Sequence, residues 1–375
     1  MSKRVGVIGG GQLAWMMAAE ASDLHIELIV QASDRDKPAV SQSHRVVIGD
    51  VDDARATAKL ASLCDVITFE NEFIDLEALF KLESKTVFRP SLDTLAPLLD
   101  KYDQRSYLKS IDIPVPKFSL WSSSENVIAE YGFPLVLKAR RHGYDGQGTF
   151  IIKDIEDLEQ LSQSVSLAEL LVEEFVPFEQ ELGIIAARNA WGDIAVYPVT
   201  QTYQKKQVCH WTITPANVPR EVAEAAEAIA RQILDKLEVV GVFGIEFFLT
   251  ADQRVLVNEV APRTHNSGHY TLDGCHTSQF AMQLQAVTDL PLGSTALKSA
   301  GALMVNLLGF EESESEYIEK RDRILEIPHS FVHWYGKTSH PGRKLGHVTV
   351  LLDAEQLPQA HSMINKIESI WMDSF

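Results

Sequence analysis

Strand-like and helix-like segments alternate through the first hundred residues, and this alternation limits the fold more than any other feature of the chain. Short apolar runs typical of buried strands lie at 5–8, 26–30, 46–48, 66–69 and 86–88. Helical stretches separate them at 12–21, 53–63 and 75–82. Strands and helices that alternate in this way form a parallel sheet flanked by helices. We therefore expect an α/β unit at the N-terminus.

The pattern changes after Ile113-Pro-Val-Pro-Lys117, which is typical of a linker. A small unit follows, with helices at 125–131 and 155–161 and strands at 135–139 and 150–153. Strands then predominate, at 182–187, 195–202, 242–249, 255–260 and 303–308, with helices at 220–237 and 277–287. Beyond an acidic stretch at 311–319, strands are expected at 331–335 and 347–352, and a helix at 354–370.

Charge and cysteine content narrow the class of partner. The formal net charge of -18 argues against a nucleic-acid surface, because phosphate backbones require clustered Lys and Arg. An anionic substrate must therefore meet local cationic pockets. Cys64, Cys209 and Cys275 lie far apart and offer neither a zinc spacing nor a disulfide framework. This predicts a reducing, cytoplasmic location without a membrane partner.

A glycine turn follows the first strand. Gly9-Gly-Gly-Gln12-Leu13-Ala14 fits G-x-G-x-x-A, and Asp34 follows the second strand, so a dinucleotide fingerprint is one interpretation. The others are a tight turn that needs glycine, and helix-start amides that hold another substrate anion.

A second glycine-rich segment lies between two predicted strands, from Lys138 through Gly143-Tyr-Asp-Gly146-Gln-Gly148 to Thr149. Its amides could wrap phosphates, and Lys138 would add a compact positive charge. The alternative is a plain hairpin loop with a surface lysine. The chain contains no GxxxxGK[ST], which excludes a P-loop.

Two glutamates are predicted to face each other across a hairpin. A two-residue turn at Asp252-Gln253 places Glu246 opposite Glu259, with Cβ atoms ~4.5–5.5 Å apart. Their carboxylates would repel by roughly 3 kcal/mol at an effective dielectric of about 20. Mg²⁺ is the natural counter-ion, since it favours carboxylates together with substrate phosphates. One protonated glutamate, an arginine partner or a register shifted by one residue are the alternatives.

Two polar runs complete the candidate sites. Arg263-Thr-His265-Asn266-Ser-Gly-His269 follows a buried strand; the helical zinc pattern is absent, so substrate-binding groups are favoured. Lys337, Arg343 and Lys344 lie on glycine- and proline-shaped turns and suit a phosphate or carboxylate, although such loops are often only solvated.

Taken together, these motifs resemble an ATP-grasp active site, and the runs 261–269 and 341–347 are similar to the N5-carboxyaminoimidazole ribonucleotide synthetase family. The resemblance covers nearly the whole chain. It implies that ATP phosphorylates bicarbonate to carboxyphosphate, which carboxylates the exocyclic amine of 5-aminoimidazole ribonucleotide. It also implies a homodimer.

The resemblance implies an ATP-grasp architecture: a Rossmann-like domain (1–100), a lid subdomain (101–175), a catalytic subdomain (176–312) and a small β-rich domain (313–375). It assigns Mg²⁺ to Glu246 and Glu259, and catalysis to Lys138, Arg263 and His265. The implied ATP-binding residues are Lys101, Lys138, Gly143, Tyr144, Asp145, Gly146, Gln147, Gly148, Thr149, Glu173, Glu174, Phe175, Val176, Glu181, Gln204, Asn258 and Glu259. The implied substrate-binding residues are Gln12, Leu13, Tyr144, Asp145, Arg263, His265, Asn266, Lys337, Arg343 and Lys344.

The chain departs from the family pattern at three places. Ala261 replaces the Asn of E-x-N-x-R, as in the synthetase subfamily; Gln201-Thr-Tyr-Gln204 stands where Glu-Asn-x-His is usual; and Glu70-Asn71-Glu72 differs locally. The competing functions are a nicotinamide-dependent oxidoreductase, a non-catalytic nucleotide-binding protein and a formate-using glycinamide ribonucleotide transformylase.

Overall fold

The computed structural model describes residues 2–141 and 148–373. Its first unit is a five-stranded parallel sheet of order β3-β2-β1-β4-β5, which confirms the expected α/β unit. Helices α1 and α10 cover one face and α2 and α3 the other, so the strands are apolar on both sides. The elements are β1 Lys3–Ile8, α1 Gln12–Ala21, β2 Ile26–Ala32, η1 Pro38–Ser41, β3 Arg45–Ile48, α2 Ala54–Ala61, β4 Val66–Phe69, α3 Leu76–Phe80 and β5 Val87–Phe88.

A polar helix that was not predicted connects this unit to the rest. After α4 (Leu92–Leu95) and η2 (Ala96–Leu98), helix α5 spans Lys101–Ser110. Its apolar residues form no continuous stripe, so periodicity gave no signal. Asp100 starts the helix by accepting hydrogen bonds from the amides of Tyr102 and Asp103. Its buried face carries Gln104 and Arg105 toward the centre of the molecule.

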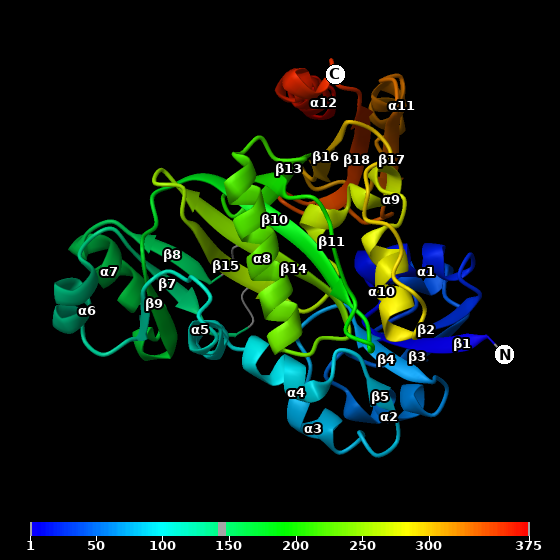
Figure 1. Cartoon of the computed structure of the whole chain (residues 1–375), viewed down its shortest axis with the longest axis horizontal. Helices are drawn as coiled ribbons and strands as arrows, with labels where there is room; N and C mark the ends of the chain where they lie inside the picture. The colour runs from blue at the N-terminus through cyan, green and yellow to red at the C-terminus, as the bar shows by residue number, and fades with distance from the viewer. Residues whose placement is uncertain (1, 142–147, 374–375) are drawn as a thin grey trace.

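A four-stranded antiparallel sheet of order β6-β9-β7-β8 forms a separate lobe, seen at the left of Figure 1. Apolar residues of α6 and α7 pack on this sheet. The elements are β6 Phe118–Leu120, α6 Ser124–Tyr131, β7 Leu135–Ala139, β8 Thr149–Ile152, α7 Ile155–Ser162, η3 Leu167–Glu169 and β9 Leu170–Glu174.

A nine-stranded antiparallel sheet forms the remainder, in the order β15-β14-β10-β12-β13-β16-β18-β17, with β11 also paired to β10. Because β16 pairs with β18, the C-terminal strands continue this sheet across residue 312. The elements are β10 Phe178–Arg188, β11 Ile194–Val196, β12 Thr200–Lys205, β13 Val208–Thr214, α8 Arg220–Lys236, β14 Gly241–Thr250, β15 Val255–Ala261, η4 Asn266–Gly268, α9 Thr271–Gly274, α10 Gln279–Val287, β16 Gly301–Leu308, α11 Ile318–Leu325, β17 Ser330–Trp334, β18 Lys344–Leu352, η5 Leu357–Gln359 and α12 Ala360–Met372.

Two predicted elements are corrected. The strand expected at 195–202 is divided into β11 and β12, because Pro198 lacks an amide hydrogen for a ladder and the chain turns there. The last helix begins at Ala360 rather than 354, after the short η5 turn.

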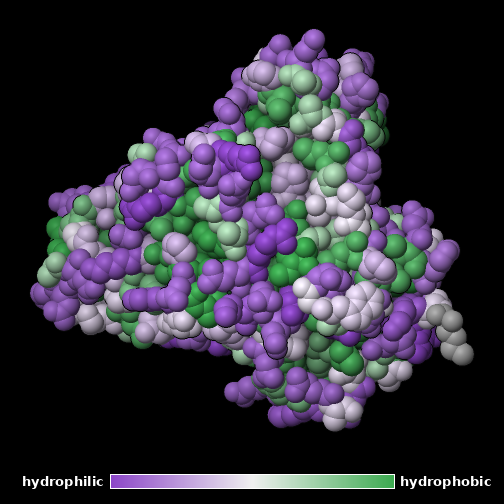
Figure 2. Space-filling model, viewed as in Figure 1, coloured by the Kyte–Doolittle hydropathy of each residue, from purple (hydrophilic) through white to green (hydrophobic). Residues whose placement is uncertain are grey.

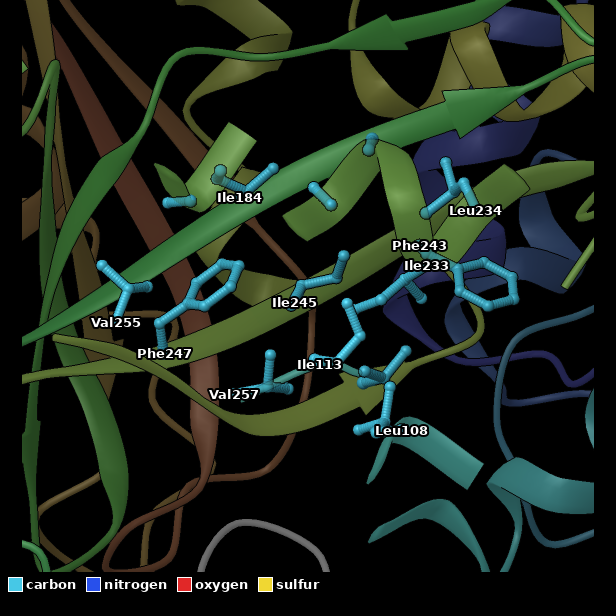
Figure 3. Close-up of a cluster of buried hydrophobic side chains, with 14 of the residues drawn as sticks. Leu108, Ile113, Ile184, Ile233, Leu234, Phe243, Ile245, Phe247, Val255 and Val257 are labelled. Carbon is cyan, nitrogen blue, oxygen red and sulfur yellow. The ribbon is translucent and has the colours of Figure 1, made fainter. Parts of the chain in front are cut away.

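The largest core lies between α8 and one face of the nine-stranded sheet. Ile184, Phe243, Ile245 and Phe247 point toward α8 from β10 and β14 (Figure 3). Alternate residues on these strands therefore point to the opposite face, away from α8. In Figure 2 the molecule has three lobes, and its visible surface is mostly hydrophilic. Among the described helices, none is long and apolar enough to cross a membrane.

Candidate active site

The sheet face opposite α8 carries the predicted carboxylates. Glu246 on β14 pairs with Gly183 on β10 and with Glu259 on β15, which confirms the predicted facing glutamates. Glu181 and Phe248 form the next pair along the same face. This face therefore gathers three glutamates from three neighbouring strands.

The hairpin reaches this register differently from the prediction. Near its turn the paired positions are Leu249 with Val255 and Phe247 with Val257, one residue off the predicted register. The predicted two-residue turn does not occur. The Thr250 amide donates to the Arg254 carbonyl, so the turn contains the three residues between them. A bulge follows Val257 and restores the glutamate pair.

Asn258 is the extra residue of that bulge, and it uses both its side chain and its backbone in the site. Its Oδ1 accepts from Lys138 Nζ at 3.1 Å, and its carbonyl accepts from Arg105 Nη2 at 2.5 Å. The bulge therefore orients two cations toward the glutamate hairpin.

Glu173 is buried between the same two cations. Its carboxylate lies 2.5 Å from Arg105 Nε and 2.7 Å from Lys138 Nζ. Burial alone would raise its pKa, but the two positive charges outweigh it and hold the pKa at about 2. One carboxylate thus pairs with two cations, so this cluster has a net positive charge that can bind an anion, although the protein as a whole is acidic.

Glu246 and Glu259 differ in their electrostatic surroundings. Lys101 Nζ lies 2.8 Å from Glu259 Oε1. Partial burial would raise the pKa of Glu259, but the positive charge of Lys101 outweighs this effect and lowers the pKa well below its usual range. Burial, then the charge of Glu259, raises the pKa of Glu246 to about 7. Burial and the charge of Glu246 likewise raise the pKa of Glu181 to about 7. The glutamate pair therefore repels, and a divalent cation would relieve that repulsion.

The donor set suits a Mg²⁺ ion that is also bound by a phosphate. Two facing carboxylates are hard oxygen ligands, and Mg²⁺ is often held by one or two of these together with substrate phosphates. Within 2–141 and 148–373, no group of three or more His, Cys, Asp or Glu side chains is placed to hold a metal by itself. The site fits a metal ion that arrives with a phosphate ligand.

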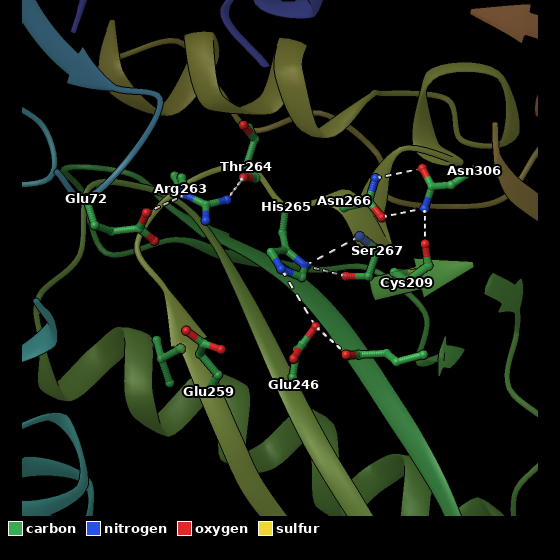
Figure 4. Close-up of polar contacts among 12 residues, drawn as sticks. Glu72, Cys209, Glu246, Glu259, Arg263, Thr264, His265, Asn266, Ser267 and Asn306 are labelled. Atoms are coloured by element: carbon green, nitrogen blue, oxygen red, sulfur yellow. Dashed lines mark hydrogen bonds and ion pairs between the residues drawn. The ribbon is translucent and has the colours of Figure 1, made fainter. Parts of the chain in front are cut away.

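Gln204 and His265 flank Glu246. Gln204 Nε2 donates to Glu246 Oε1 at 3.3 Å. His265 Nε2 lies 3.7 Å from the same oxygen, and Figure 4 shows the His265 ring above Glu246. The backbone of Gly244 makes room for His265, because a Cβ there would lie 2.3 Å from the His265 Cβ. Glycine at 244 therefore lets His265 approach the backbone of β14 closely.

Arg263 and Asn266 have separate partners in the same loop. Arg263 Nε donates to Glu72 Oε2 at 2.9 Å, which joins this loop to the N-terminal unit. The Asn266 amide pairs reciprocally with that of Asn306, at 3.1 and 2.7 Å (Figure 4). Asn266 thus anchors the loop to β16, and its expected contact with the substrate stays a prediction.

The first glycine turn binds a carboxylate of the protein itself. Glu70 accepts from the amides of Gly11, Leu13 and Ala14 at 2.6, 3.0 and 3.3 Å. A Cβ on Gly11 would lie 2.5 Å from Glu70 Oε1. The dinucleotide interpretation is therefore wrong, because Glu70 occupies the amides that would bind a pyrophosphate. The same contact leaves these amides no place for a substrate anion.

The C-terminal cations lie on the other side of that turn. Lys337 Nζ hydrogen-bonds Gln12 Oε1 and lies 5.4 Å from the centre of the Tyr335 ring. Arg343 Nη1 donates to the Thr338 carbonyl at 3.0 Å within its own turn. Lys344 begins β18 and is close enough to lower the pKa of Glu246 slightly. Lys337 and Gln12 are thus brought together from opposite ends of the chain.

Other residues that were predicted to bind ATP lie at or between the ends of strands. Gly148, with φ of +85°, precedes β8, and Thr149 is the first residue of that strand. Glu174 accepts from the Lys117 amide at 2.7 Å. Phe175 and Val176 lie between β9 and β10. Gly143, Tyr144, Asp145, Gly146 and Gln147 lie outside the described residues.

Sequence reasoning missed Arg105, Asn306 and also Gln279, whose side chain binds the backbone of His265, and it left Glu70 and Glu72 without a role. Arg105 lies one helical turn after Lys101, so a recognised α5 would have placed both cations on one face. The others bind partners distant in sequence, for which one sequence carries no signal.

Three family models match the chain. They are the ribonucleotide synthetase preATP-grasp domain over 1–97, the ATP-grasp domain over 106–280 and the phosphoribosylaminoimidazole carboxylase C-terminal domain over 302–359. The chain is 52% identical to the N5-carboxyaminoimidazole ribonucleotide synthase of Synechococcus elongatus, an alignment that covers 98% of this chain and 95% of the relative.

Solved structures are similar over the same length. The N5-carboxyaminoimidazole ribonucleotide synthetase of Thermotoga maritima is 38% identical with a TM-score of 0.87, over 98% of both chains. The N5-carboxyaminoimidazole synthase of Aspergillus clavatus, in complex with ADP and 5-aminoimidazole ribonucleotide, is 30% identical with a TM-score of 0.92. That match covers 99% of this chain and 98% of the other.

Proposed function

The chain belongs to the N5-carboxyaminoimidazole ribonucleotide synthase family of ATP-grasp ligases, and we propose how its own residues carry out the family's reaction. It is an ATP-dependent ligase of purine biosynthesis that forms N5-carboxyaminoimidazole ribonucleotide. We propose bicarbonate as the source of the carboxylate and carboxyphosphate as the intermediate.

The ATP phosphates bind at Lys101 and Lys138, together with the segment from Gly143 to Thr149. The proposal is supported by the cation cluster, in which Lys101, Arg105 and Lys138 outnumber the low-pKa carboxylates Glu173 and Glu259. Lysine charges at this point would stabilise the phosphoryl group as it leaves ADP.

Mg²⁺ would be held by Glu246 and Glu259, with Asn258 and Gln204 beside them. When bound, this ion would neutralise phosphate charge during transfer. The raised pKa of Glu246 supports the assignment, because the negative charge of Glu259 contributes to it and a metal ion would relieve that repulsion.

The adenosine part of ATP is proposed to contact 173–176 and Glu181. The segment 173–176 connects the two antiparallel sheets, so its backbone edge can bind a base between them. Because Arg105 and Lys138 use the Glu173 side chain, we assign the adenine contact to backbone groups of Glu174, Phe175 and Val176.

The ribonucleotide is proposed to bind where the N-terminal turn, the Arg263–His265 segment and the C-terminal cations meet. Lys337 lies against Gln12, and Arg263 against Glu72. Arg343 and Lys344 would add charge for the monophosphate, as Leu13, Tyr144 and Asp145 would add contacts to the base and ribose. Asn266 supports this pocket through Asn306.

The reaction then balances as two transfers. A bicarbonate oxygen attacks the γ-phosphorus of ATP, and ADP leaves. The exocyclic amine of the ribonucleotide attacks the carboxyl carbon of carboxyphosphate; the N–C bond forms, the C–O bond to phosphorus breaks, and phosphate and one amine proton depart. Arg263 would hold the carboxyl group, and His265 would orient the amine beside it.

One observation carries this proposal most strongly: a cation-rich pocket on the same sheet face as a repelling glutamate pair. Its test is ADP release with each substrate omitted in turn. We expect release to require both bicarbonate and aminoimidazole ribonucleotide. Equal release with formate and glycinamide ribonucleotide would move the chain to transformylase activity.

Three further proposals complete the account. The division at residues 100, 175 and 312 is supported by the parallel sheet before 100 and the four-stranded sheet before 175, although the large sheet crosses 312. A homodimer follows the family resemblance. A cytoplasmic location is supported by Cys64, Cys209 and Cys275, all of which are free thiols.

A further inference from the structure

Gln279, at the start of α10, is fully buried and binds the backbone of an active-site residue on both sides. Its Oε1 accepts from the His265 amide at 2.9 Å, and its Nε2 donates to the His265 carbonyl at 2.7 Å. The same Nε2 lies 3.3 Å from His269 Nδ1. One side chain thus satisfies both polar backbone groups of His265.

The amide of Gln279 can have only one orientation in this setting. The backbone N–H of His265 requires an acceptor and its carbonyl requires a donor, so Oε1 and Nε2 cannot exchange places. The second hydrogen of Nε2 then points to His269 Nδ1, which must accept it. His269 is therefore held as the tautomer protonated on Nε2.

The His265 ring has little freedom once its backbone is fixed. It lies on Gly244, its Nδ1 is 2.9 Å from Ser267 Oγ, and its Nε2 faces Glu246 at 3.7 Å. Gly268 packs directly against the Gln279 amide, where a Cβ would lie 2.7 Å from Oε1. Loop and helix are therefore shaped to each other at this point.

We infer that Gln279 is a positioning residue for the reaction: it holds the His265 backbone so that the imidazole faces Glu246 and the ribonucleotide pocket. This inference rests on the proposed function, in which His265 orients the amine. Gln279 itself touches no proposed substrate atom. Misplacement of an active-site group by about 1 Å can cost about 100-fold in rate.

The same helix offers a matched control. Gln283, one turn further along α10, is also buried, and its amide likewise binds a backbone amide (Val242, 2.5 Å) and a second partner (Thr68 Oγ1, 2.6 Å). Its partners lie outside the 263–269 loop. Gln279→Met and Gln283→Met thus each remove buried amide hydrogen bonds from one helix, and each includes a bond from a backbone amide.

The test combines steady-state kinetics and thermal unfolding of both variants in the full-length enzyme. We expect Tm to fall in both variants, with kcat/KM for the ribonucleotide reduced about 10- to 100-fold only in Gln279→Met. Equal kinetic losses in both variants, or none in Gln279→Met, would overturn the inference. If Gln279→Met does not fold, Gln279→Asn keeps an uncharged amide that is one methylene shorter and cannot reach both backbone groups of His265, and the same result is expected.

A double-mutant cycle with His265→Ala separates this inference from the proposed function. We expect Gln279→Met to add no further kinetic loss in the His265→Ala background, because both changes remove the same placement. Full additivity would show that Gln279 acts independently of His265 and would overturn the inference. Wild-type kinetics in His265→Ala alone would instead contradict the proposed role of His265.

Discussion

At the scale of single residues, the electrostatics of the site depend on which carboxylate each cation binds. Lys138 and Arg105 share Glu173, and Lys101 binds Glu259, whereas Glu246 is contacted by the Gln204 amide and the His265 ring. Burial and the charge of Glu259 raise the pKa of Glu246 to about 7. A metal ion would act at that point of unbalanced charge.

Glu259→Gln tests the metal assignment. The change keeps the shape but removes one ligand charge, so Mg²⁺ should bind less well in the presence of an ATP analogue, and turnover should fall by about 100-fold or more. The fold should survive, because Glu259 and Lys101 are partly exposed and such pairs add little stability. Titration calorimetry measures the binding of Mg²⁺, steady-state kinetics measure kcat, and thermal unfolding measures whether the fold survives.

Asp252→Asn, at the exposed tip of the same hairpin, is the control and should behave as wild type. Wild-type turnover in Glu259→Gln would rule out a metal role for Glu259. Loss of folding would show that the pair is structural.

Arg343→Ala tests the proposed phosphate contact. A hydrogen bond to a charged group contributes about 1.5–3 kcal/mol, so the KM for the ribonucleotide should rise about 10- to 150-fold. The KM for ATP should hardly change, because Lys101 and Lys138 serve that ligand. Arg254→Ala, an arginine on the distant hairpin turn, is the control. A rise confined to the ATP KM would show that Arg343 binds the other phosphate.

His347 gives the fold a pH dependence. Burial lowers the pKa of His347 well below its usual value. Below about pH 6.5 the imidazole is therefore protonated in the unfolded chain but stays neutral in the folded protein. Stability from this residue is therefore present above that pH and lost as pH falls. In urea unfolding, the advantage of wild type over His347→Gln should shrink from pH 7.5 to 5.5. An advantage independent of pH would contradict the burial of a neutral imidazole.

At the scale of elements, the β14–β15 hairpin shows what a sequence can and cannot reveal. The pairing of Glu246 with Glu259 was predicted correctly, but from a two-residue turn that does not occur. A longer turn shifts the register by one residue, and the bulge shifts it back. Neither change alters the hydrophobic pattern enough to be recognised from the sequence.

Deletion of Asn258 tests the bulge as an element. The shortened β15 can continue the register of Phe247 with Val257, so the glutamate should still face Glu246. Lys138 and Arg105 would lose their contacts to Asn258. We expect a folded protein whose KM for ATP is raised about 10-fold or more. An unchanged KM for ATP would show that the bulge does not position these cations.

At the scale of the whole molecule, the site exists because three parts of the chain converge. The parallel sheet was recognisable because buried strands and helices alternate in sequence. The contacts that connect it to the rest were not, since Glu72 with Arg263 and Gln12 with Lys337 join residues 191 and 325 positions apart. Periodicity describes elements; it carries no information about which elements meet.

The central claim is that ATP activates bicarbonate, and its most direct test is the fate of the bicarbonate oxygens. The enzyme should be supplied with ¹⁸O-labelled bicarbonate, ATP and aminoimidazole ribonucleotide, and the released phosphate analysed by ³¹P NMR. If carboxyphosphate forms, one bicarbonate oxygen becomes the bridging oxygen and leaves with phosphorus, so the phosphate should carry one ¹⁸O. Phosphate without label, released at the same rate as the carboxylated product, would contradict the mechanism.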